Sequence, residues 1–170
     1  MRSTEAALIA RNRAPGLSRD FAARKWSGFA PASVWADAAE EARSLEYHGE
    51  YHIFASDIDP KAVALARENA RRAGVADDIA FSVADARVWQ PPAERGAIVC
   101  NPPYGERMLE KKEAQALYRG FGQALTGVWD WKKFVISSDA DFERCFGRAA
   151  DKKRKLYNGM LQCNLYMYFT

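Results

Sequence analysis

The sequence predicts an α/β fold built on a mainly parallel sheet. Short apolar segments alternate with segments of helical spacing between residues 51 and 136, and this alternation is typical of parallel strands joined by crossover helices. Residues 154–169 differ, because two strand-like runs flank Asn158-Gly159, a dipeptide typical of tight hairpin turns. We therefore expect an antiparallel hairpin at one edge of the sheet.

Strands are expected where apolar or alternating runs end at turn residues. Ile79, Phe81 and Val83 alternate with small residues, which indicates a half-buried strand. In the last run, Cys163 and Leu165 share one face, while Tyr166 belongs to the other. The predicted strands are 51–55, 79–83, 97–100, 134–136, 154–157 and 160–169.

Helices are expected where helical spacing coincides with start and stop signals. The clearest spans residues 60–73, because Asp59 is a good N-cap, Pro60 fits the first helical position and Gly74 follows the end. The aromatic residues between 16 and 36 are interpreted as apolar anchors, with the tryptophans in the core. The predicted helices are 3–13, 36–46, 60–73, 112–126 and a short one from about residue 141.

Length and composition indicate one ordinary globular domain, residues 1–170. The chain has 170 residues, of which 48% are hydrophobic and 28% charged. Apolar runs such as residues 6–10 are far shorter than the ~20 residues of a membrane span, so no membrane association is expected. The formal net charge of +3 permits a nucleic-acid partner without requiring one.

Cysteine and histidine usage predicts neither a disulfide framework nor a metal site. Cys100, Cys145 and Cys163 are odd in number and form no C-x-x-C pair. His48 and His52 lie close together without a neighbouring cysteine. With no continuous apolar run at the N-terminus, a secretory signal is not expected either. We therefore expect a reduced cytoplasmic protein.

Polar residues follow three of the predicted strands, where open parallel sheets bind their ligands. Asp57 follows the first strand and could accept hydrogen bonds from ribose hydroxyls, or could cap a turn. Asp85 follows the second and could accept from an adenine amine, or could equally be a turn aspartate. Alone, neither aspartate decides between these roles.

The third strand runs into Asn101-Pro102-Pro103-Tyr104, a more specific signal. Two prolines fix an extended turn that has no backbone donors. The Asn101 side-chain oxygen and the Pro102 carbonyl can then accept both N–H groups of a planar exocyclic amine, leaving its lone pair for an electrophile. Tyr104 supplies a flat face on which a base can stack. The alternative is a structural turn with a buried tyrosine.

This motif resembles the signature of class I S-adenosylmethionine-dependent amino-methyltransferases, which act on adenine N6 or guanine N2. The longer string, residues 101–107, is similar to an RNA methylase family whose members usually carry an N-terminal THUMP RNA-binding domain. Members are often labelled N6-adenine-specific DNA methylases, and bacterial relatives include a 23S rRNA guanine-N2 methyltransferase. Three further segments agree with this resemblance: residues 5–17, 56–59 and 153–159.

The resemblance implies a Rossmann-like class I methyltransferase sheet, S-adenosylmethionine as cofactor and RNA as partner. It implies that Asp57 holds the cofactor ribose, Ile58 lies against the adenine and Asp85 meets the adenine amine. The expected catalytic residues are Asn101, Pro102, Pro103 and Tyr104, and the expected cofactor residues are Asp57, Ile58, Asp85 and Asn101.

The sequence departs from that family at its start. The family places an aspartate and a Cys-Gly-Ser-Gly-Thr-like loop before the helix that begins here near Glu5. We therefore expect a partial domain that lacks the first strand, the glycine-rich loop and any THUMP domain, and that binds cofactor weakly or not at all. The first strand is central in this fold, so the edge left without it could pair with another chain to form an oligomer.

Three functions remain open from the sequence. The leading hypothesis is methyl transfer to an exocyclic amine of an RNA base, most specifically guanine N2 of 23S rRNA. The alternatives are an adenine-N6 DNA methyltransferase, and a non-catalytic nucleic-acid-binding remnant that lacks the cofactor loop. The basic run of residues 152–155 could follow a phosphate backbone or form a solvated face.

Overall fold

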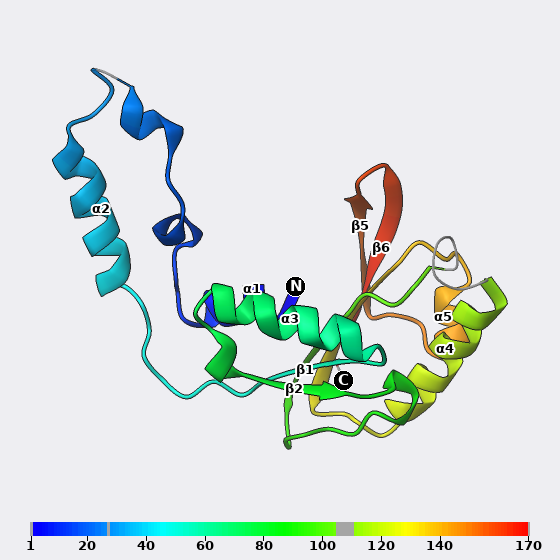
Figure 1. Ribbon diagram of the computed structural model, residues 1–170. Helices are drawn as coiled ribbons and strands as arrows, with labels where there is room; N and C mark the ends of the chain where they lie inside the picture. Colours follow the sequence, from blue (N-terminus) through cyan, green and yellow to red (C-terminus); the bar gives the residue numbers. More distant parts are fainter. Residues whose placement is uncertain (1, 27, 105–110, 170) are drawn as a thin grey trace. The chain divides into compact units, whose positions relative to one another are not determined.

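The computed structural model describes residues 2–26, 28–104 and 111–169 (Figure 1). The chain forms two compact units, Met1–Val83 and Ala84–Thr170, and each is described here by itself. Within the described residues, every helix is too short or too polar to cross a bilayer.

The body of the first unit is a two-stranded parallel sheet covered by two helices. Strands β1 (Ile53–Asp57) and β2 (Ile79–Val83) pair with Ile53 opposite Ile79. Helices α1 (Arg2–Ala10) and α3 (Pro60–Arg72) contact the sheet and each other. Their small core comprises Ala7, Ala70, Val75 and Ile79. Arg11 fastens this layer through two hydrogen bonds to Asp78, of 2.5 and 2.7 Å, at the end of the short helix η3 (Ala76–Asp78).

A long excursion separates α1 from β1, and we call residues 15–47 the arm. It contains two short helical turns, η1 (Pro15–Ser18) and η2 (Ala22–Lys25), and helix α2 (Ala32–Ser44), none of which holds a buried residue among those described. The last residue of the arm is joined to the chain that follows α1, because the Tyr47 amide donates to the Arg11 carbonyl at 2.7 Å.

The aromatic residues of the arm are not core residues. The prediction that the tryptophans lie in the core was therefore wrong for Trp26. Trp26 and Phe29 are each 61% exposed. Phe21 stacks on Trp35 at 5.9 Å between ring centroids, and Phe29 lies 6.3 Å from the same ring. The aromatic spacing was compatible with burial in the core, but these side chains pack on one another.

The second unit is built on a four-stranded mixed sheet of order β3-β4-β6-β5. Strands β3 (Gly96–Cys100) and β4 (Trp131–Ser137) are parallel, and β6 (Leu161–Tyr168) is antiparallel to both β4 and β5 (Lys152–Asn158). Helices α4 (Lys111–Ala124) and α5 (Phe142–Phe146) contact one another. Their aromatic core includes Tyr118, Phe121, Phe142, Phe146, Tyr166 and Tyr168.

A close approach between α4 and the end of α5 requires glycine at position 122. A Cβ atom there would lie 1.9 Å from the Phe146 carbonyl oxygen, so any side chain would separate the two helices. Gly120 and Gly122 both lie inside α4 and therefore do not form a phosphate-binding loop.

The predicted elements are confirmed with small shifts at their ends, and two details differ. The sequence predicted a single sheet, but the described residues form two. Strand β1 pairs only with β2 in the first sheet, and β3 pairs only with β4 in the second, among the described residues. In the hairpin, Asn158 pairs with Leu161, so Gly159 and Met160 form the turn, and Gly159 has the positive φ of 63°. The turn therefore starts one residue later than Asn158-Gly159 suggests.

The carboxylate of Glu143 on α5 anchors the chain that leads into β5. One oxygen accepts from the Ala150 amide and the other from Lys153 Nζ, both at 2.8 Å. Burial raises the pKa of Glu143, but these two hydrogen bonds lower it by more, so its pKa lies below the ordinary 4.5.

Because this pKa is lowered by folding, Glu143 stabilises the chain above pH 4.5 and loses that effect as the pH falls. We expect Glu143→Gln to lower the melting temperature at pH 7, with the difference from the unchanged chain becoming smaller as the pH falls below 4.5. Melting curves over a series of pH values measure this difference, with the exposed Glu94→Gln as control. A difference that stays constant as the pH falls contradicts the assignment.

Candidate active site

The polar residues predicted to follow three strands do follow them, but they belong to two different units. Asp57 ends β1 and Ile58 follows it, in the first unit. Asp85 follows β2, and Asn101 follows β3, both in the second unit. Gly105, Glu106 and Arg107 of the motif lie outside the described residues.

Asp57 forms the turn that starts α3. Its Oδ1 accepts from the Asp59 amide at 2.9 Å, and Asp59 Oδ1 in turn caps α3 by accepting from the Lys61 amide at 2.9 Å. Both aspartates are exposed, and Ile58 between them is 63% exposed. The turn role considered for Asp57 is therefore confirmed, while the carboxylate and the Ile58 side chain remain accessible to a ligand.

Asp85 is held by Arg87. It caps the short helix η4 (Ala86–Val88) by accepting from the Arg87 amide at 2.9 Å. The Arg87 guanidinium also donates to both carboxylate oxygens, at 2.5 to 3.0 Å. These bonds, the side-chain ones foremost, lower the pKa of Asp85 below its ordinary 3.8. Asp85 is thus an ionised acceptor whose two oxygens already have a partner.

The Asn-Pro-Pro-Tyr segment is rigid and its asparagine is accessible. Pro102 is buried, and Asn101 is exposed. The Tyr104 hydroxyl donates to Asn101 Oδ1, a hydrogen bond that the motif alone does not predict. An amide oxygen has two lone pairs, so Asn101 can accept one further hydrogen bond while Tyr104 holds it.

Sequence reasoning also missed the support beneath this segment. The hydroxyl of Tyr118, on α4, donates to the Pro103 carbonyl at 2.7 Å. The helical spacing marks Tyr118 only as an apolar position, because a tyrosine at such a position is indistinguishable from other core aromatics. Its partner, a proline carbonyl 15 residues away, leaves no local pattern in the sequence.

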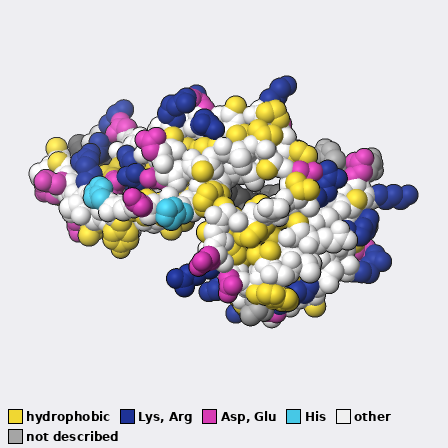
Figure 2. Space-filling model, turned by 90° about the horizontal axis from the view of Figure 1, so that it is seen from below, with side chains coloured by type: hydrophobic (Ala, Val, Ile, Leu, Met, Phe, Trp, Pro, Cys, Tyr) yellow, Lys and Arg dark blue, Asp and Glu magenta, His cyan; other side chains and the backbone are white. Residues whose placement is uncertain are grey.

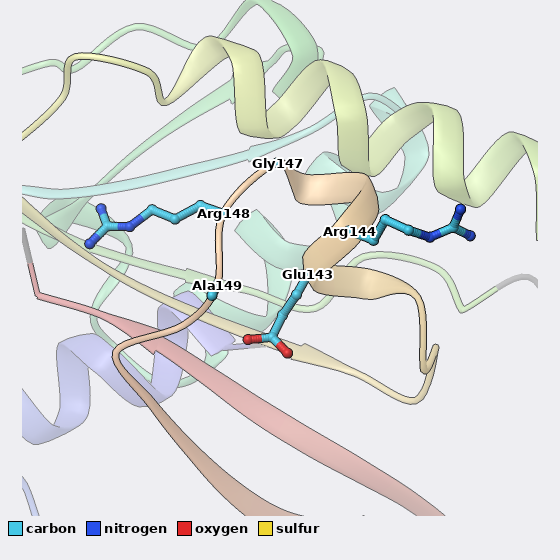
Figure 3. Close-up of a pocket in the computed structure, with 5 residues that line it drawn as sticks. All are labelled: Glu143, Arg144, Gly147, Arg148 and Ala149. Carbon is cyan, nitrogen blue, oxygen red and sulfur yellow. The ribbon is translucent and has the colours of Figure 1, made fainter.

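The described residues offer no candidate metal centre beside this segment. Over the part of the chain that the structure describes, no three His, Cys, Asp or Glu side chains are arranged to hold an ion. A surface depression beside α5 is lined by Glu143, Arg144, Gly147, Arg148 and Ala149 (Figure 3). Glu143 there serves the structural contacts already described, and none of the predicted site residues lines the depression.

The basic run of residues 152–155 lies on β5, the edge strand of the second sheet. Its four side chains are exposed, and Lys153 is paired with Glu143. Further along the strand, Tyr157 is 67% exposed. Elsewhere charge is mixed, since basic and acidic side chains intermingle over the face shown in Figure 2. Lysines on an edge strand also discourage pairing with other chains.

Residues 3–167 match the model of the RMKL-like methyltransferase domain. The chain belongs to the RMKL-like methyltransferase domain family. This membership confirms the family resemblance found in residues 101–107 and the expectation of a methyltransferase domain.

Relatives of this family place the match within longer proteins. The chain is 41% identical over 167 residues to "Putative RNA methyltransferase YpsC" of Bacillus subtilis, covering 98% of this chain and 43% of that protein. It is 40% identical over 170 residues to ribosomal RNA large subunit methyltransferase K/L of Shewanella baltica, covering 96% of this chain and 24% of that protein. The chain thus spans less than half the length of these RMKL-like relatives.

A solved structure confirms the methyltransferase fold. The crystal structure of SMU.472 complexed with SAH, the demethylated form of S-adenosylmethionine, superposes with a TM-score of 0.93 at 37% identity. The match covers 98% of this chain and 44% of that one. The predicted cofactor is therefore of the same kind as the ligand found in this structural neighbour.

The effect of Arg87 on the pKa of the Asp85 carboxyl can be measured directly. We expect Arg87→Met to raise the pKa of the Asp85 carboxyl towards 3.8, because the side-chain hydrogen bonds are removed while the backbone one remains. Methionine preserves the stem, whose Cγ lies beside Gly120. Carboxyl-carbon NMR titration gives the value.

The matched control is Arg72→Met, which removes a guanidinium from Glu68 on α3. It should raise the pKa of Glu68 and leave that of Asp85 alone. An Asp85 pKa that does not change in Arg87→Met would show that Arg87 is not its main partner.

Proposed function

We propose that this chain is the catalytic domain that transfers a methyl group from S-adenosylmethionine to an exocyclic amine of an RNA base. The base we infer is guanine, at N2, in 23S rRNA. The observation that carries the proposal is the rigid Asn101-Pro102-Pro103-Tyr104 segment directly after β3. The rRNA methyltransferase name of one relative and the RNA methyltransferase name of another support this substrate class.

The segment offers the acceptors that an amine needs. The two N–H groups of the amine donate to Asn101 Oδ1 and to the Pro102 carbonyl, which orients the nitrogen lone pair outwards. Accepting both hydrogens also stabilises the positive charge that develops on nitrogen during attack. Neither proline has an N–H group that would compete for these acceptors.

The cofactor supplies an electrophilic sulfonium methyl group. The nitrogen–carbon bond forms as the sulfur–carbon bond breaks, and the amine then loses a proton to solvent. The chain contributes positioning and electrostatic stabilisation, with no covalent enzyme intermediate. Tyr104 stacks on the base, which is flipped out of any duplex to reach Asn101.

The residues expected to hold the cofactor fit it to different degrees. Asp57 is exposed and uses one carboxylate oxygen in its turn, so the other suits a ribose hydroxyl. The exposed Ile58 suits an apolar contact with adenine. Asp85 fits least well, because each of its carboxylate oxygens already accepts two hydrogen bonds from Arg87, which uses both lone pairs of each oxygen. A protein that acts on rRNA would work in the cytoplasm, which is the location expected from the sequence.

Replacing Asn101 tests the proposed chemistry. We expect Asn101→Ala to abolish methyl transfer to a 23S rRNA fragment while RNA binding changes little, because the missing acceptor acts on the amine alone. Mass analysis of nucleosides after incubation with labelled S-adenosylmethionine identifies the product, and a DNA substrate run in parallel distinguishes adenine N6. Asn69→Ala on α3 is the control.

Full activity of Asn101→Ala would refute the assigned role. Methylated adenine in DNA, with no product in RNA, would show that the substrate is DNA and not RNA. Salt-dependent RNA binding by the unchanged chain, without transfer at saturating cofactor, would favour the non-catalytic alternative.

The edge strand β5 is the proposed binding surface for RNA phosphates. Replacing Lys152, Arg154 and Lys155 by Gln should weaken binding of a labelled 23S rRNA fragment. It should also reduce the slope of log K against log salt by roughly 0.7 for each phosphate that these side chains neutralise. The triple variant of Lys61, Arg71 and Arg72 on α3 removes the same charge and should leave the slope unchanged. Equal effects of both variants would indicate a general charge effect.

A further inference from the structure

A line of hydrogen bonds, made by the buried side chains of Tyr118 and Ser137, supports the Asn-Pro-Pro-Tyr segment. The Tyr118 hydroxyl donates to the Pro103 carbonyl at 2.7 Å. Ser137, the last residue of β4, donates to the Tyr118 hydroxyl at 3.4 Å, and its Oγ accepts from the Asp139 amide at 3.1 Å. The line therefore joins the segment after β3 to the end of the neighbouring strand through α4.

The segment needs such an anchor because of its prolines. Pro102 and Pro103 have no N–H group, so their backbone can be fixed only through its carbonyl oxygens. The Pro103 carbonyl is the one that a buried donor reaches. Without that donor, the Pro103 carbonyl would be a half-buried acceptor that has lost its protein partner. The peptide groups on either side of it could then rotate.

Tyr118 is well suited to hold this carbonyl in place. Its side chain is fully buried, and its ring packs edge-to-face on Phe142 at 5.0 Å between centroids. Burial raises the pKa of the hydroxyl, so it keeps its proton at neutral pH. A hydroxyl has one proton to donate, and here that proton goes to Pro103 while Ser137 donates to the oxygen.

The far end of the line is fixed as firmly. The Asp139 carboxylate, almost wholly buried, accepts from Gln115 Nε2 at 3.1 Å and from the Asp141 amide at 2.9 Å. Because Gln115 and Tyr118 lie on the same helix, α4 is tied twice to the end of β4. The position of the Tyr118 hydroxyl is thus determined by α4 and β4 together.

We propose that Tyr118 is a positioning residue for methyl transfer: its hydrogen bond to Pro103 sets the orientation of the Pro102 carbonyl and of the Asn101 side chain that receive the target amine. This inference rests on the proposed function, because it concerns the same acceptors. Tyr118 itself contacts neither base nor cofactor in this scheme.

The test compares two variants, in each of which a buried tyrosine is replaced by phenylalanine and so loses only its hydroxyl group. Tyr118→Phe removes the donor to Pro103, whereas Tyr168→Phe removes a donor to the Arg148 carbonyl at 3.4 Å in the same core. We expect Tyr118→Phe to lower kcat by about ten- to a hundred-fold, since small displacements of a reacting group have effects of this size. KM for S-adenosylmethionine should not change. Tyr168→Phe should keep the original kcat even where its melting temperature falls.

A second readout does not depend on activity. The chain has five asparagines, so labelling asparagine with ¹⁵N gives few side-chain amide signals. We expect the Asn101 amide signal to shift in Tyr118→Phe and to stay in place in Tyr168→Phe. Ser137→Ala, which removes the hydroxyl behind Tyr118, should shift it in the same direction by less.

The outcomes separate this inference from the proposed function. An unshifted Asn101 signal with an unchanged kcat in Tyr118→Phe overturns the positioning role. Equal decreases of kcat in Tyr118→Phe and Tyr168→Phe overturn it too, because they indicate a general effect of stability. If the unchanged chain transfers no methyl group, the proposed function fails, and the Asn101 signal alone decides whether Tyr118 holds the segment.

Discussion

The approach of α4 to α5 at Gly122 determines the geometry of the second unit. Without a Cβ at this position, α4 lies against the Phe146 carbonyl, and the aromatic rings of α4, α5 and β6 pack into one core. Tyr118 lies one turn earlier on α4, so the same approach brings its hydroxyl to the Pro103 carbonyl. A side chain at position 122 would move the support of the candidate site along with the core.

Local patterns in the sequence were enough to predict most of the strands and helices. Asp59, Pro60 and Gly74 bound α3 as expected, because capping depends on neighbouring backbone groups alone. The site segment was found for the same reason: two prolines after an apolar run have a fixed local meaning.

The contacts that organise the site could not be predicted in this way. The bonds from Tyr118 to Pro103 and from Arg87 to Asp85 depend on where whole elements pack. The exposure of Trp26 was missed for a related reason, because composition alone does not say whether an aromatic residue packs on the sheet or on its own segment. The division into two sheets could not be predicted from local patterns either, because the pairing of β1 with β2 and of β3 with β4 depends on contacts between distant residues.

The hydrogen bond from Tyr104 to Asn101 has a consequence for discrimination among bases. Under the proposed reaction, a base that carries an exocyclic amine would bring donors to Asn101 Oδ1 and the Pro102 carbonyl, and so would compensate for the water that it displaces. Uracil has only a carbonyl oxygen at the corresponding position and would leave these acceptors unpaired opposite another acceptor. Such mismatches reject a ligand far more strongly than a poor apolar fit does. The segment would therefore reject uracil by repulsion between acceptors, and would accept the bases that carry an exocyclic amine.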